Sequence, residues 1–432
     1  NLQPVALGIY SKEEGFAAFK AKKLKLPARQ EPVCLVAVGD IMLSRGVAGE
    51  IRKHGDLRHP FLKVEKYLKG GDIIFGNLEN PITPGREIMM PEMILRADPG
   101  VETALKDAGF TMLSLANNHL PDFGRQGLLD TFQYLDQAGI MYAGVGKTEK
   151  EAFAAKYIDV KGLKLAFLAF TDPGLVPGSY LAGVDHPGTA FLDQEKVRAA
   201  VRDAGEKVDF VVVSMHTGTE YESGPDRTQI QFAHLAVDAG ADLVLGHHPH
   251  VLQKVEVYKG KYIFYSLGNF VFDQKWSRAT REGLMAKIYI TPKGVEKVEF
   301  LPVFINDQDQ PQVLDGEEAK QVINTLGLKL EEAAGPVWDQ ENRVFRESKK
   351  YTFYAQRPLL ASRLVKTRHF DLDQDGKNED YSLQDGKLKV ATGSQIIWQS
   401  PDDWWVDDFF LGDSNNDSVP ELNLLVWKSG SF

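Results

Sequence analysis

The chain has little cysteine and no long apolar run, and each absence excludes a class of protein. Cys34 is the single cysteine among 432 residues, so neither a disulfide nor a thiolate metal site can be built. It stands in the apolar run VCLVAV, where a core position is expected. No apolar run reaches the roughly 18–20 residues of a membrane-spanning helix. The sequence begins with Asn1 rather than Met, which predicts a processed N-terminus.

Clustered positive charge is also missing. The formal net charge is −10, and the 50 lysines and arginines are scattered rather than grouped in blocks. This pattern gives no electrostatic footprint for nucleic acid, which is therefore not an expected partner. Any anionic substrate must be held by a local site. With 43% hydrophobic residues, a chain of this length is expected to form two domains.

The composition and apolar pattern of the sequence divide it into three parts. Residues 1–31 hold a short helix-like piece and the breaker-rich LPARQEP, and they are expected to form an arm or linker. Residues 32–350 alternate short β-branched runs with segments of helical period, the pattern of parallel strands connected by helices. Residues 351–432 change to short strands, tryptophans and acidic turns. We therefore expect an α/β domain followed by a small, mostly β C-terminal module.

The apolar runs of the α/β domain predict its strands. They are VCLVAVGD, DIIFGNLE, TMLSLANNH, LKLAFLAFT, DFVVVSMHTG, DLVLGHHPH and YIFYSLGNF. Several are apolar on both faces, which is typical of a sheet covered on both sides. The helix candidates between them include GVETALKDAGF, GRQGLLDTFQYLDQAGI, DQEKVRAAVRDAGEK and RTQIQFAHLAVDAG. LMAKIYITPKGVEKVEFLPVFI predicts an antiparallel hairpin at the sheet's edge, and EEAKQVINTLGLKLEEAAG predicts one more helix.

Two acidic turns of the C-terminal module share a spacing. Oxygen-bearing side chains fall at relative positions 1, 3, 5 and 9 of DLDQDGKNED and DSNNDSVPE. These residues are Asp371, Asp373, Asp375 and Glu379, and Asp413, Asn415, Asp417 and Glu421. The spacing turns alternate side chains toward one point, which suits Ca²⁺; a solvated acidic turn is the alternative, but two copies favour calcium. Because the flanks read as strands, the turns resemble the calcium loops of FG-GAP-type β-propeller repeats, and two repeats make an incomplete propeller.

Polar side chains gather at the carboxyl ends of the predicted strands, where ligands bind in open α/β sheets. Of ten histidines, five stand at three such ends. A lone histidine there is more often structural, so the argument depends on the group. If the segment is extended, His248 and His250 project to one side, and His247 faces the other way as a supporting or structural residue. The expected ligands of Mn²⁺, Fe²⁺ or Zn²⁺ are Asp40, Glu79, Asn118, His216, His248 and His250.

Six segments in order carry a family resemblance. They are AVGDIMLSRGV, FGNLENPIT, LANNHLPDFGRQGLLDTFQYLDQAGIMYAGVG, SMHTGTEY, GHHPHV and YSLGNFVFD, within about residues 33–275. They resemble the CapA family of bacterial capsule and poly-γ-glutamate biosynthesis proteins, which is related to calcineurin-like metallophosphoesterases. The resemblance implies a metallophosphoesterase-like four-layer α/β sandwich with a dinuclear metal centre. It makes Asp40 the first-strand aspartate, places Glu79 in the region of the bridging carboxylate, and makes Asn118 and His119 the Asn-His pair.

Two positions depart from the phosphoesterase pattern. Its first motif is Asp-x-His, but Met42 stands two residues after Asp40 and is a poor ligand for a hard cation. Its second motif is Gly-Asp, but here Gly76 is followed by Asn77, with Glu79 two residues further on. One ligand is therefore missing relative to that pattern, and bridging by Glu79 is left open.

The same motifs supply candidates for catalysis. In a hydrolase, a metal pair would polarise the scissile phosphoryl or acyl group, and His119 would protonate the leaving group. Asp122 could orient the His119 ring, although a helix N-cap role suits it equally well. Candidate substrate contacts are Arg45, Arg96, Glu220 and Tyr221. For each arginine a surface ion pair is the alternative.

These features favour a cell-surface metal-dependent hydrolase or transferase of the CapA type that acts on an anionic polymer or phosphoester. The rival is a non-catalytic component of a poly-γ-glutamate export or anchoring assembly, which would bind polymer carboxylates through its metal. A degenerate fold with a structural metal is a third reading. The resemblance also implies an extracellular or cell-surface location, a membrane-bound poly-γ-glutamate synthesis complex as partner, and anchoring through an N-terminal segment.

Overall fold

The computed structural model divides the chain into two compact units, Glu31–Arg357 and Asn1–Gln30 with Pro358–Phe432. The residues described are 3–4, 31–85, 94–328, 331–334, 337–339, 344–346, 351–356, 366–370, 378–384, 387–400, 404–412 and 421–428. Among these residues, no helix is both long enough and apolar enough to cross a bilayer.

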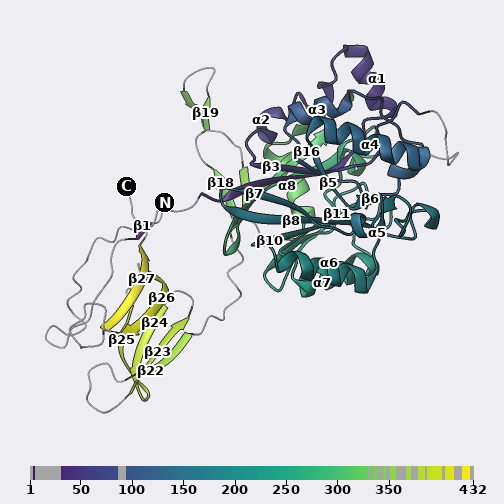
Figure 1. Cartoon of the computed structure of the whole chain (residues 1–432). Coiled ribbons are helices and arrows are strands. Elements are labelled where there is room, and N and C mark those ends of the chain that lie inside the picture. Colours follow the sequence, from purple (N-terminus) through teal and green to yellow (C-terminus); the bar gives the residue numbers. More distant parts are fainter. Residues whose placement is uncertain are drawn as a thin grey trace. The chain divides into compact units, whose positions relative to one another are not determined.

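The larger unit is built on two sheets (Figure 1). The first runs in the order β18 (Glu331–Ala334), β21 (Tyr351–Gln356), β16 (Gly294–Ile305), β15 (Glu282–Thr291), β2 (Val33–Ile41), β3 (Ile73–Leu78), β4 (Met112–Ser114) and β5 (Met141–Ala143), with β14 (Asn269–Val271) beside β2 and β17 (Pro311–Val313) beside β16. The second runs β12 (Val255–Tyr258), β13 (Lys261–Phe264), β11 (Leu243–His247), β10 (Phe210–His216), β8 (Leu163–Thr171) and β7 (Lys156–Val160). Two short pairs are β6 (Val145–Gly146) with β9 (Gly188–Thr189), and β19 (Val337–Asp339) with β20 (Val344–Arg346).

Helices cover the outer faces of both sheets, so the unit has four layers (Figure 1). On the first sheet lie α1 (Arg45–His54), α2 (Glu65–Leu68), α3 (Val101–Ala108) and α4 (Gly124–Ala138); on the second lie α5 (Glu149–Ala152), α6 (Gln194–Gly205) and α7 (Arg227–Ala239). Helix α8 is Gly316–Thr325, and the short 3₁₀ helices are η2 (His59–Phe61), η3 (Leu120–Phe123), η4 (Gly178–Tyr180) and η5 (Ala279–Arg281).

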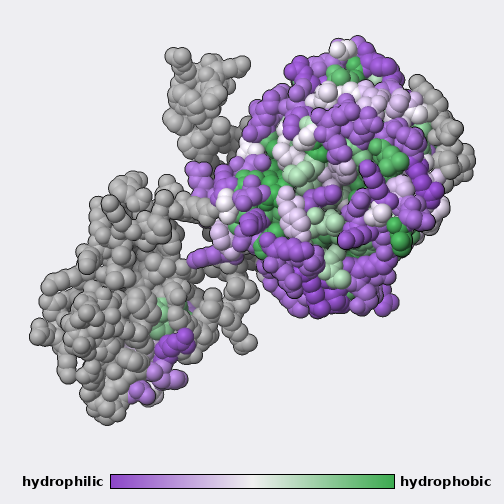
Figure 2. Space-filling model, viewed as in Figure 1, coloured by the Kyte–Doolittle hydropathy of each residue, from purple (hydrophilic) through white to green (hydrophobic). Residues whose placement is uncertain are grey.

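Strand alternation produces the three apolar cores between these layers. In β2, Leu35 packs between the two sheets whereas its neighbour Val36 packs under the helices of the first sheet. In β8, Phe167 joins the core between the sheets and Leu168 the core under α6 and α7. The strands are therefore apolar on both faces because both faces are covered, as expected for the α/β sandwich. The face of this unit seen in Figure 2 is mainly hydrophilic, with small apolar patches.

The structure confirms the α/β fold class and corrects two local predictions. The hairpin of β15 and β16 is antiparallel, but it is not at an edge: β15 pairs with β2, and β16 pairs with β17 and β21. The predicted helix ends at Thr325, because Gly327 takes a positive φ of 71° and the chain then enters β18. A helix-period pattern near the end of a domain did not reveal this turn.

The smaller unit is mostly β. Its described strands are β1 (Gln3–Pro4), β22 (Lys366–Phe370), β23 (Glu379–Gln384), β24 (Lys387–Thr392), β25 (Gln395–Gln399), β26 (Trp404–Gly412) and β27 (Glu421–Lys428). They form a sheet of order β22-β23-β24-β25 and another of order β1-β27-β26.

The predicted calcium turns fall between antiparallel neighbours of these sheets, β22 with β23 and β26 with β27. Glu379 begins β23, where it is buried and accepts a hydrogen bond from Tyr381, and Glu421 begins β27. The other predicted calcium ligands lie outside the described residues: Asp371, Asp373, Asp375, Asp413, Asn415 and Asp417.

Candidate metal centre

The carboxyl ends of several strands meet at one buried site. Strands β2, β3 and β4 run parallel in the first sheet, and β10 and β11 run parallel in the second. Asp40, near the end of β2, Glu79, just after β3, and His216, the last residue of β10, are each fully buried. Loops that follow parallel strands converge in this way, which is why side chains far apart in sequence become neighbours.

Three of the predicted ligands form a first cluster. Ligand atoms of Glu79, His216 and His248 all lie within 4.8 Å of one another. Nε2 of His216 lies 2.7 Å from Oδ1 of Asn118, so the Asn118 side chain faces this cluster as well. On the other side of the ring, Asn77 donates a hydrogen bond to Nδ1 of His216 at 3.3 Å.

A second cluster shares one residue with the first. Ligand atoms of Asp40, Glu79 and His250 also lie within 4.8 Å of one another. Oδ2 of Asp40 is 3.5 Å from Nδ1 of His250, and Oε1 of Glu79 is 3.6 Å from its Nε2. The structure therefore brings together all six residues that the sequence predicts as metal ligands.

Glu79 is the residue common to both clusters, and its environment suits a cation. Its Oε1 atom is buried, has no hydrogen-bond partner, and lies 3.9 Å from Nε2 of His216. Nδ1 of His248 is likewise buried without a partner. A buried carboxylate oxygen left unpaired is costly unless a positive charge is close. Mixed imidazole, carboxylate and amide donors are the set that divalent transition metals prefer, so the residues present fit a metal pair.

The charge balance of the site leads to the same conclusion. Burial, and then the charge of Asp40, raise the pKa of Glu79 well above its ordinary value. Burial would also raise the pKa of Asp40, but the neighbouring imidazoles of His247 and His250 hold it well below its ordinary value. Two buried carboxyl groups thus compete for positive charge, and a divalent cation between them would satisfy both.

The histidines differ in charge state. Burial, with the proximity of His248, lowers the pKa of His216 well below its ordinary value, and burial, with the proximity of His250, lowers that of His248 to about 3. For His250, burial is outweighed by Glu79 and Asp40, and its pKa rises to about 9. Neutral imidazole is the form that binds a metal, so His216 and His248 are in the ligand state at neutral pH.

The histidine turn after β11 is not extended, which corrects the geometry assumed from its sequence. His248 has a φ of 100° and His250 a φ of 57°. Such conformations are unfavourable for non-glycine residues and concentrate at functional sites. The two rings still reach the same centre, with centroids 6.0 Å apart, because the backbone bends rather than because alternate side chains share a face.

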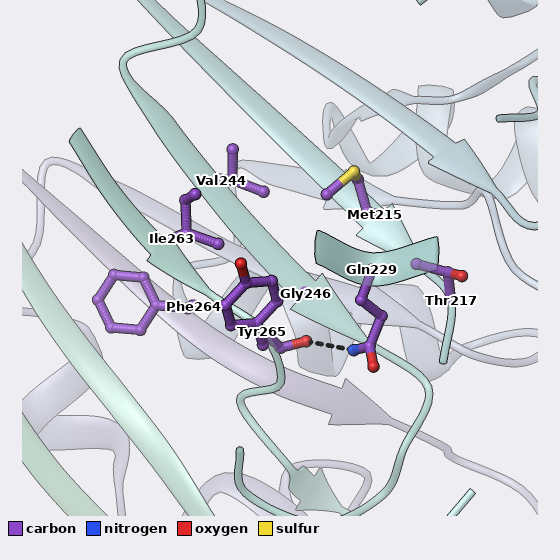
Figure 3. A pocket seen from close by; sticks show the side chains of 8 residues that line it. All are labelled: Met215, Thr217, Gln229, Val244, Gly246, Ile263, Phe264 and Tyr265. Carbon is purple, nitrogen blue, oxygen red and sulfur yellow. Dashed lines mark hydrogen bonds between the residues drawn. The ribbon is translucent and has the colours of Figure 1, made fainter. Parts of the chain in front are cut away.

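Close packing behind the turn holds this backbone in place. A Cβ atom at Gly246 would lie 2.0 Å from the carbonyl oxygen of Tyr265, so no other residue fits there. Figure 3 shows Gln229 of α7 donating a hydrogen bond to the same carbonyl, at 3.1 Å. The amide of Gln229 also donates to Gln253, which in turn donates to the carbonyls of Glu222 and Gly224. These contacts tie the histidine turn to the loop that follows His216.

Three buried asparagines support the ligands and were not predicted as site residues. Asn77 donates to Asp40 at 2.8 Å, and Asn117 donates to Asn77 and to the carbonyl of Leu78. Asn269 accepts from Nδ1 of His250 at 3.0 Å, which leaves Nε2 of that ring facing Glu79. Fixing one imidazole nitrogen in this way orients a metal-binding histidine. Their position at strand ends, within GNLE, ANNH and LGNF, was the signal available in the sequence.

His247 and Met42 are not members of either cluster, although His247 contacts Asp40. Nδ1 of His247 lies 3.2 Å from Oδ1 of Asp40, and its ring packs 6.1 Å from that of Phe75 between the sheets. His247 therefore supports Asp40 from the core between the two sheets. Met42 is fully buried in the core under the helices, and its sulfur accepts from the amide of Ser44. The methionine thus occupies a core position and supplies no ligand to the clusters.

His119 and Asp122 form a hydrogen-bonded pair at the start of η3. Nδ1 of His119 lies 2.9 Å from Oδ2 of Asp122, and that oxygen also accepts the amide of Leu95. His119 is close enough to His248 to contribute to lowering its pKa. The orienting contact expected for Asp122 is present, and it fixes the His119 ring with Nε2 as its remaining polar atom.

The predicted substrate contacts are of two kinds. The guanidinium of Arg96 is 13% exposed and donates to the carbonyl of Thr83 and to Asp98, so its donors are used within the protein. Arg45 pairs with Asp273 but keeps 33% of its side chain exposed. Tyr221 is 43% exposed beside His250, and its partial burial, with the charge of Glu220, raises its pKa to about 12.

Comparison with known families now identifies this arrangement. The model described as "Bacterial capsule synthesis protein PGA_cap" matches residues 34–274, more than half of the chain. The chain belongs to the PGA_cap family. The matched segment contains both ligand clusters and the His119–Asp122 pair.

Several relatives agree with this membership. The "Capsule biosynthesis protein CapA" of Bacillus anthracis is 34% identical over 320 residues, which cover 72% of this chain and 76% of the relative. The "PGA biosynthesis protein CapA" of Bacillus subtilis (strain 168) is 36% identical, over 72% of this chain and 82% of the relative. A "Probable polyglutamine synthesis accessory protein" of Mycobacterium tuberculosis is 32% identical, over 57% of this chain and 68% of the relative.

Among solved structures, the superposition with a calcineurin-like phosphoesterase of Bacillus subtilis covers 66% of this chain and 89% of that chain, with a TM-score of 0.35 and 13% sequence identity. A TM-score this low supports no argument, so the four-layer architecture of this PGA_cap protein rests on its own sheets and helices.

Proposed function

We propose that this protein is a metal-dependent hydrolase or transferase in capsule or poly-γ-glutamate biosynthesis, acting on an anionic polymer or a phosphoester. The observation that carries the proposal is Glu79, whose unpaired Oε1 lies between two ligand clusters. Membership of the PGA_cap family, and relatives named for capsule and PGA biosynthesis, support the biological setting.

The two clusters define which residues would hold the metals. His216 and His248, with Asn118 beside them, would hold one ion, and Asp40 and His250 the other. Glu79 would serve both, because its carboxylate belongs to each cluster. When bound, a divalent metal pair supplies Lewis-acid polarisation of the scissile phosphoryl or acyl group.

Proton transfer is assigned to the His119–Asp122 pair. Asp122 accepts from Nδ1 of His119 and so orients the ring. Nε2 of His119 then protonates the leaving group, a role worth about 10²–10⁴-fold in rate for a well-placed general acid. Because Asp122 is anchored by the amide of Leu95, the pair is held rigidly at the start of η3.

Substrate binding is assigned to the exposed side chains beside the centre. Arg45 retains exposed donors for a carboxylate or phosphate, while Glu220 and Tyr221 lie on the loop after His216. Because the protein as a whole is acidic, with a net charge of −10, an anionic polymer would have to be held by local positive charge such as that of Arg45 and the bound metals.

A second function is favoured by two observations. The Mycobacterium tuberculosis relative is named as an accessory protein, and this chain lacks the histidine that follows the first aspartate in phosphoesterases. A non-catalytic component that binds polymer carboxylates through its metals, within a membrane-bound poly-γ-glutamate synthesis complex, is therefore the alternative.

Turnover separates the two functions. The full chain would be loaded with Mn²⁺, Fe²⁺ or Zn²⁺ and incubated with aryl phosphates and with poly-γ-glutamate, each with and without a chelator. Metal-dependent product formation from either substrate supports the enzyme. Binding of the polymer without any product, in every metal, would establish the non-catalytic component instead.

The proposal that the smaller unit binds calcium rests on its sequence. The repeated 1, 3, 5, 9 spacing of oxygen-bearing residues supports binding of Ca²⁺. Loops of extracellular modules commonly bind Ca²⁺ at about 10⁻⁴–10⁻³ M, a range filled outside the cell, so calcium binding and an extracellular or cell-surface location are proposed together.

A further inference from the structure

An anchored segment beside the metal centre presents one exposed tryptophan. The segment follows β14 and runs from Phe272 to Trp276. Asp273 pairs with Arg45 and accepts the amide of Gly46 at 2.9 Å, and Lys275 pairs with Asp309 at 2.6 Å. Trp276 is nevertheless 64% exposed. An exposed large aromatic on an otherwise anchored segment calls for an explanation other than core packing.

Trp276 continues a row of rings that begins at the metal centre. The ring of His250 is 6.1 Å from that of Tyr221, and Tyr221 is 5.8 Å from Trp276 in an edge-on contact of 77°. Tyr221 is itself 43% exposed. A γ-linked glutamate repeat has five backbone bonds, against three in the α-linked peptide with its 3.8 Å repeat, so it spans about 6 Å when extended. Each step between the rings therefore corresponds to about one repeat of such a chain.

Tyr221 is held in this row in an unfavourable backbone conformation. Its φ is 67°, in the left-handed region that non-glycine residues avoid, and its amide donates to the carbonyl of Pro249. Its hydroxyl accepts from Gln274, and Gln274 accepts from Asn269, which also accepts from His250. Tyr221 is thus linked through Gln274 to Asn269, the residue that orients His250, and backbone strain at such a place is typical of a functional position.

We propose that Tyr221 and Trp276 form an extended polymer-binding subsite, which takes a γ-linked glutamate chain as it leaves the metal centre. This inference rests on the proposed function for the identity of the polymer. Aromatic faces pack on the methylene and amide groups of such a chain, and Arg45 takes a side carboxylate. Trp276 lies two residues beyond the segment matched by the family, so the family match does not include it.

The test compares oligomers of two lengths. The metal-loaded full chain and its Trp276→Ala variant would be titrated calorimetrically with γ-linked glutamate oligomers of two and eight residues. We expect the eight-residue oligomer to bind about 3–10-fold more weakly to the variant, the range for loss of one aromatic contact, and the two-residue oligomer to lose less. Trp276→Phe should restore most of the affinity. Val184→Ala is the matched control, because Val184 is 85% exposed on a different loop.

The outcomes separate the subsite from the proposed function. Equal metal content by mass spectrometry and unchanged circular dichroism would show that Trp276→Ala keeps the centre and the fold. If the variant then binds the eight-residue oligomer as tightly as the unaltered protein does, the subsite is refuted and the proposed function stands. If the unaltered protein binds neither oligomer, the polymer assignment fails, and the subsite fails with it. An equal loss for both lengths would also overturn the subsite, because it would place Trp276 at the centre itself.

Discussion

Glu79 is the residue on which both halves of the proposed metal centre depend. Its carboxylate belongs to the cluster of His216 and to that of His250, and one oxygen has no protein partner. The sequence left its bridging role open, because the aspartate of the phosphoesterase pattern is replaced by Asn77 two residues earlier. In the structure Asn77 instead donates hydrogen bonds to Asp40 and Glu79, so it supports the carboxylates rather than replacing one.

Removing ligands one at a time should therefore change metal content in a graded way. His248→Ala and His250→Ala should each lower the affinity for one metal ion, by more than the 10–100-fold typical of supporting residues. Glu79→Ala should lower the affinity for both ions. The measurement is metal content by mass spectrometry after equilibration at limiting metal. His234→Ala is the control, since His234 pairs with Glu256 away from either cluster. Unchanged metal content in all three ligand variants would rule out the site.

His119 is expected to act on the substrate rather than to hold metal. His119→Asn should retain metal but slow turnover of substrates with poor leaving groups by about 10²–10⁴-fold, with a smaller effect when the leaving group needs no proton. Steady-state kinetics on a series of aryl phosphates of graded leaving-group acidity measures this. If the variant loses its metal, His119 is a ligand and the acid must be sought elsewhere.

At the scale of elements, the centre depends on how closely β2 approaches Gly268, the residue before β14. A Cβ atom at Gly39 would lie 1.9 Å from the carbonyl oxygen of Gly268. The next residue, Asp40, donates its amide to that same oxygen at 3.0 Å. The close approach therefore sets where the Asp40 carboxylate enters the site.

Gly39→Ala should accordingly both destabilise the fold and displace Asp40. We expect a loss of at least about 1–3 kcal/mol in the free energy of unfolding, because the backbone contact has no flexible atom to yield, together with weaker metal binding. Gly49→Ala in α1 is the matched control: nothing lies within 4 Å of its Cβ position, and the exchange should stabilise by about 0.5–1 kcal/mol. Urea denaturation of both variants measures the difference in the free energy of unfolding. Equal stability of the two variants would contradict the packing argument.

At the scale of the whole molecule, the chain has two units that are expected to respond to different ions. The larger unit holds the two candidate metal-ligand clusters, and the sequence of the smaller unit holds the predicted calcium turns. A ligand that binds only the native state stabilises it by mass action. The smaller unit, Asn1–Gln30 with Pro358–Phe432, has a small core to which such stabilisation is a large addition.

We expect the smaller unit to melt at a clearly higher temperature in millimolar Ca²⁺ than in chelator, while the larger unit responds chiefly to transition metals. Asp373→Ala and Asp417→Ala should each remove part of the calcium shift, since each deletes one predicted ligand from one turn. Differential scanning calorimetry of the full chain resolves the two transitions. Identical melting with and without Ca²⁺ would mean that the turns are solvated acidic loops.

The sequence by itself determined the fold class and which residues meet. Apolar runs such as VCLVAV and LKLAFLAF indicated strands covered on both faces, and polar residues at their carboxyl ends indicated one shared site. Both signals are local: strand alternation and the position of a residue at a strand end can be read from neighbouring residues, and parallel strands bring such ends together.

Only the tertiary structure decided how those residues are arranged. The positive φ values of His248 and His250, the sharing of Glu79 and the support from Asn77, Asn117 and Asn269 depend on contacts between segments distant in sequence. The row from His250 through Tyr221 to Trp276 arises in the same way, from three separate loops, which follow β11, β10 and β14. Local propensity carries no information about such contacts, because their energies arise only once both sheets have packed together.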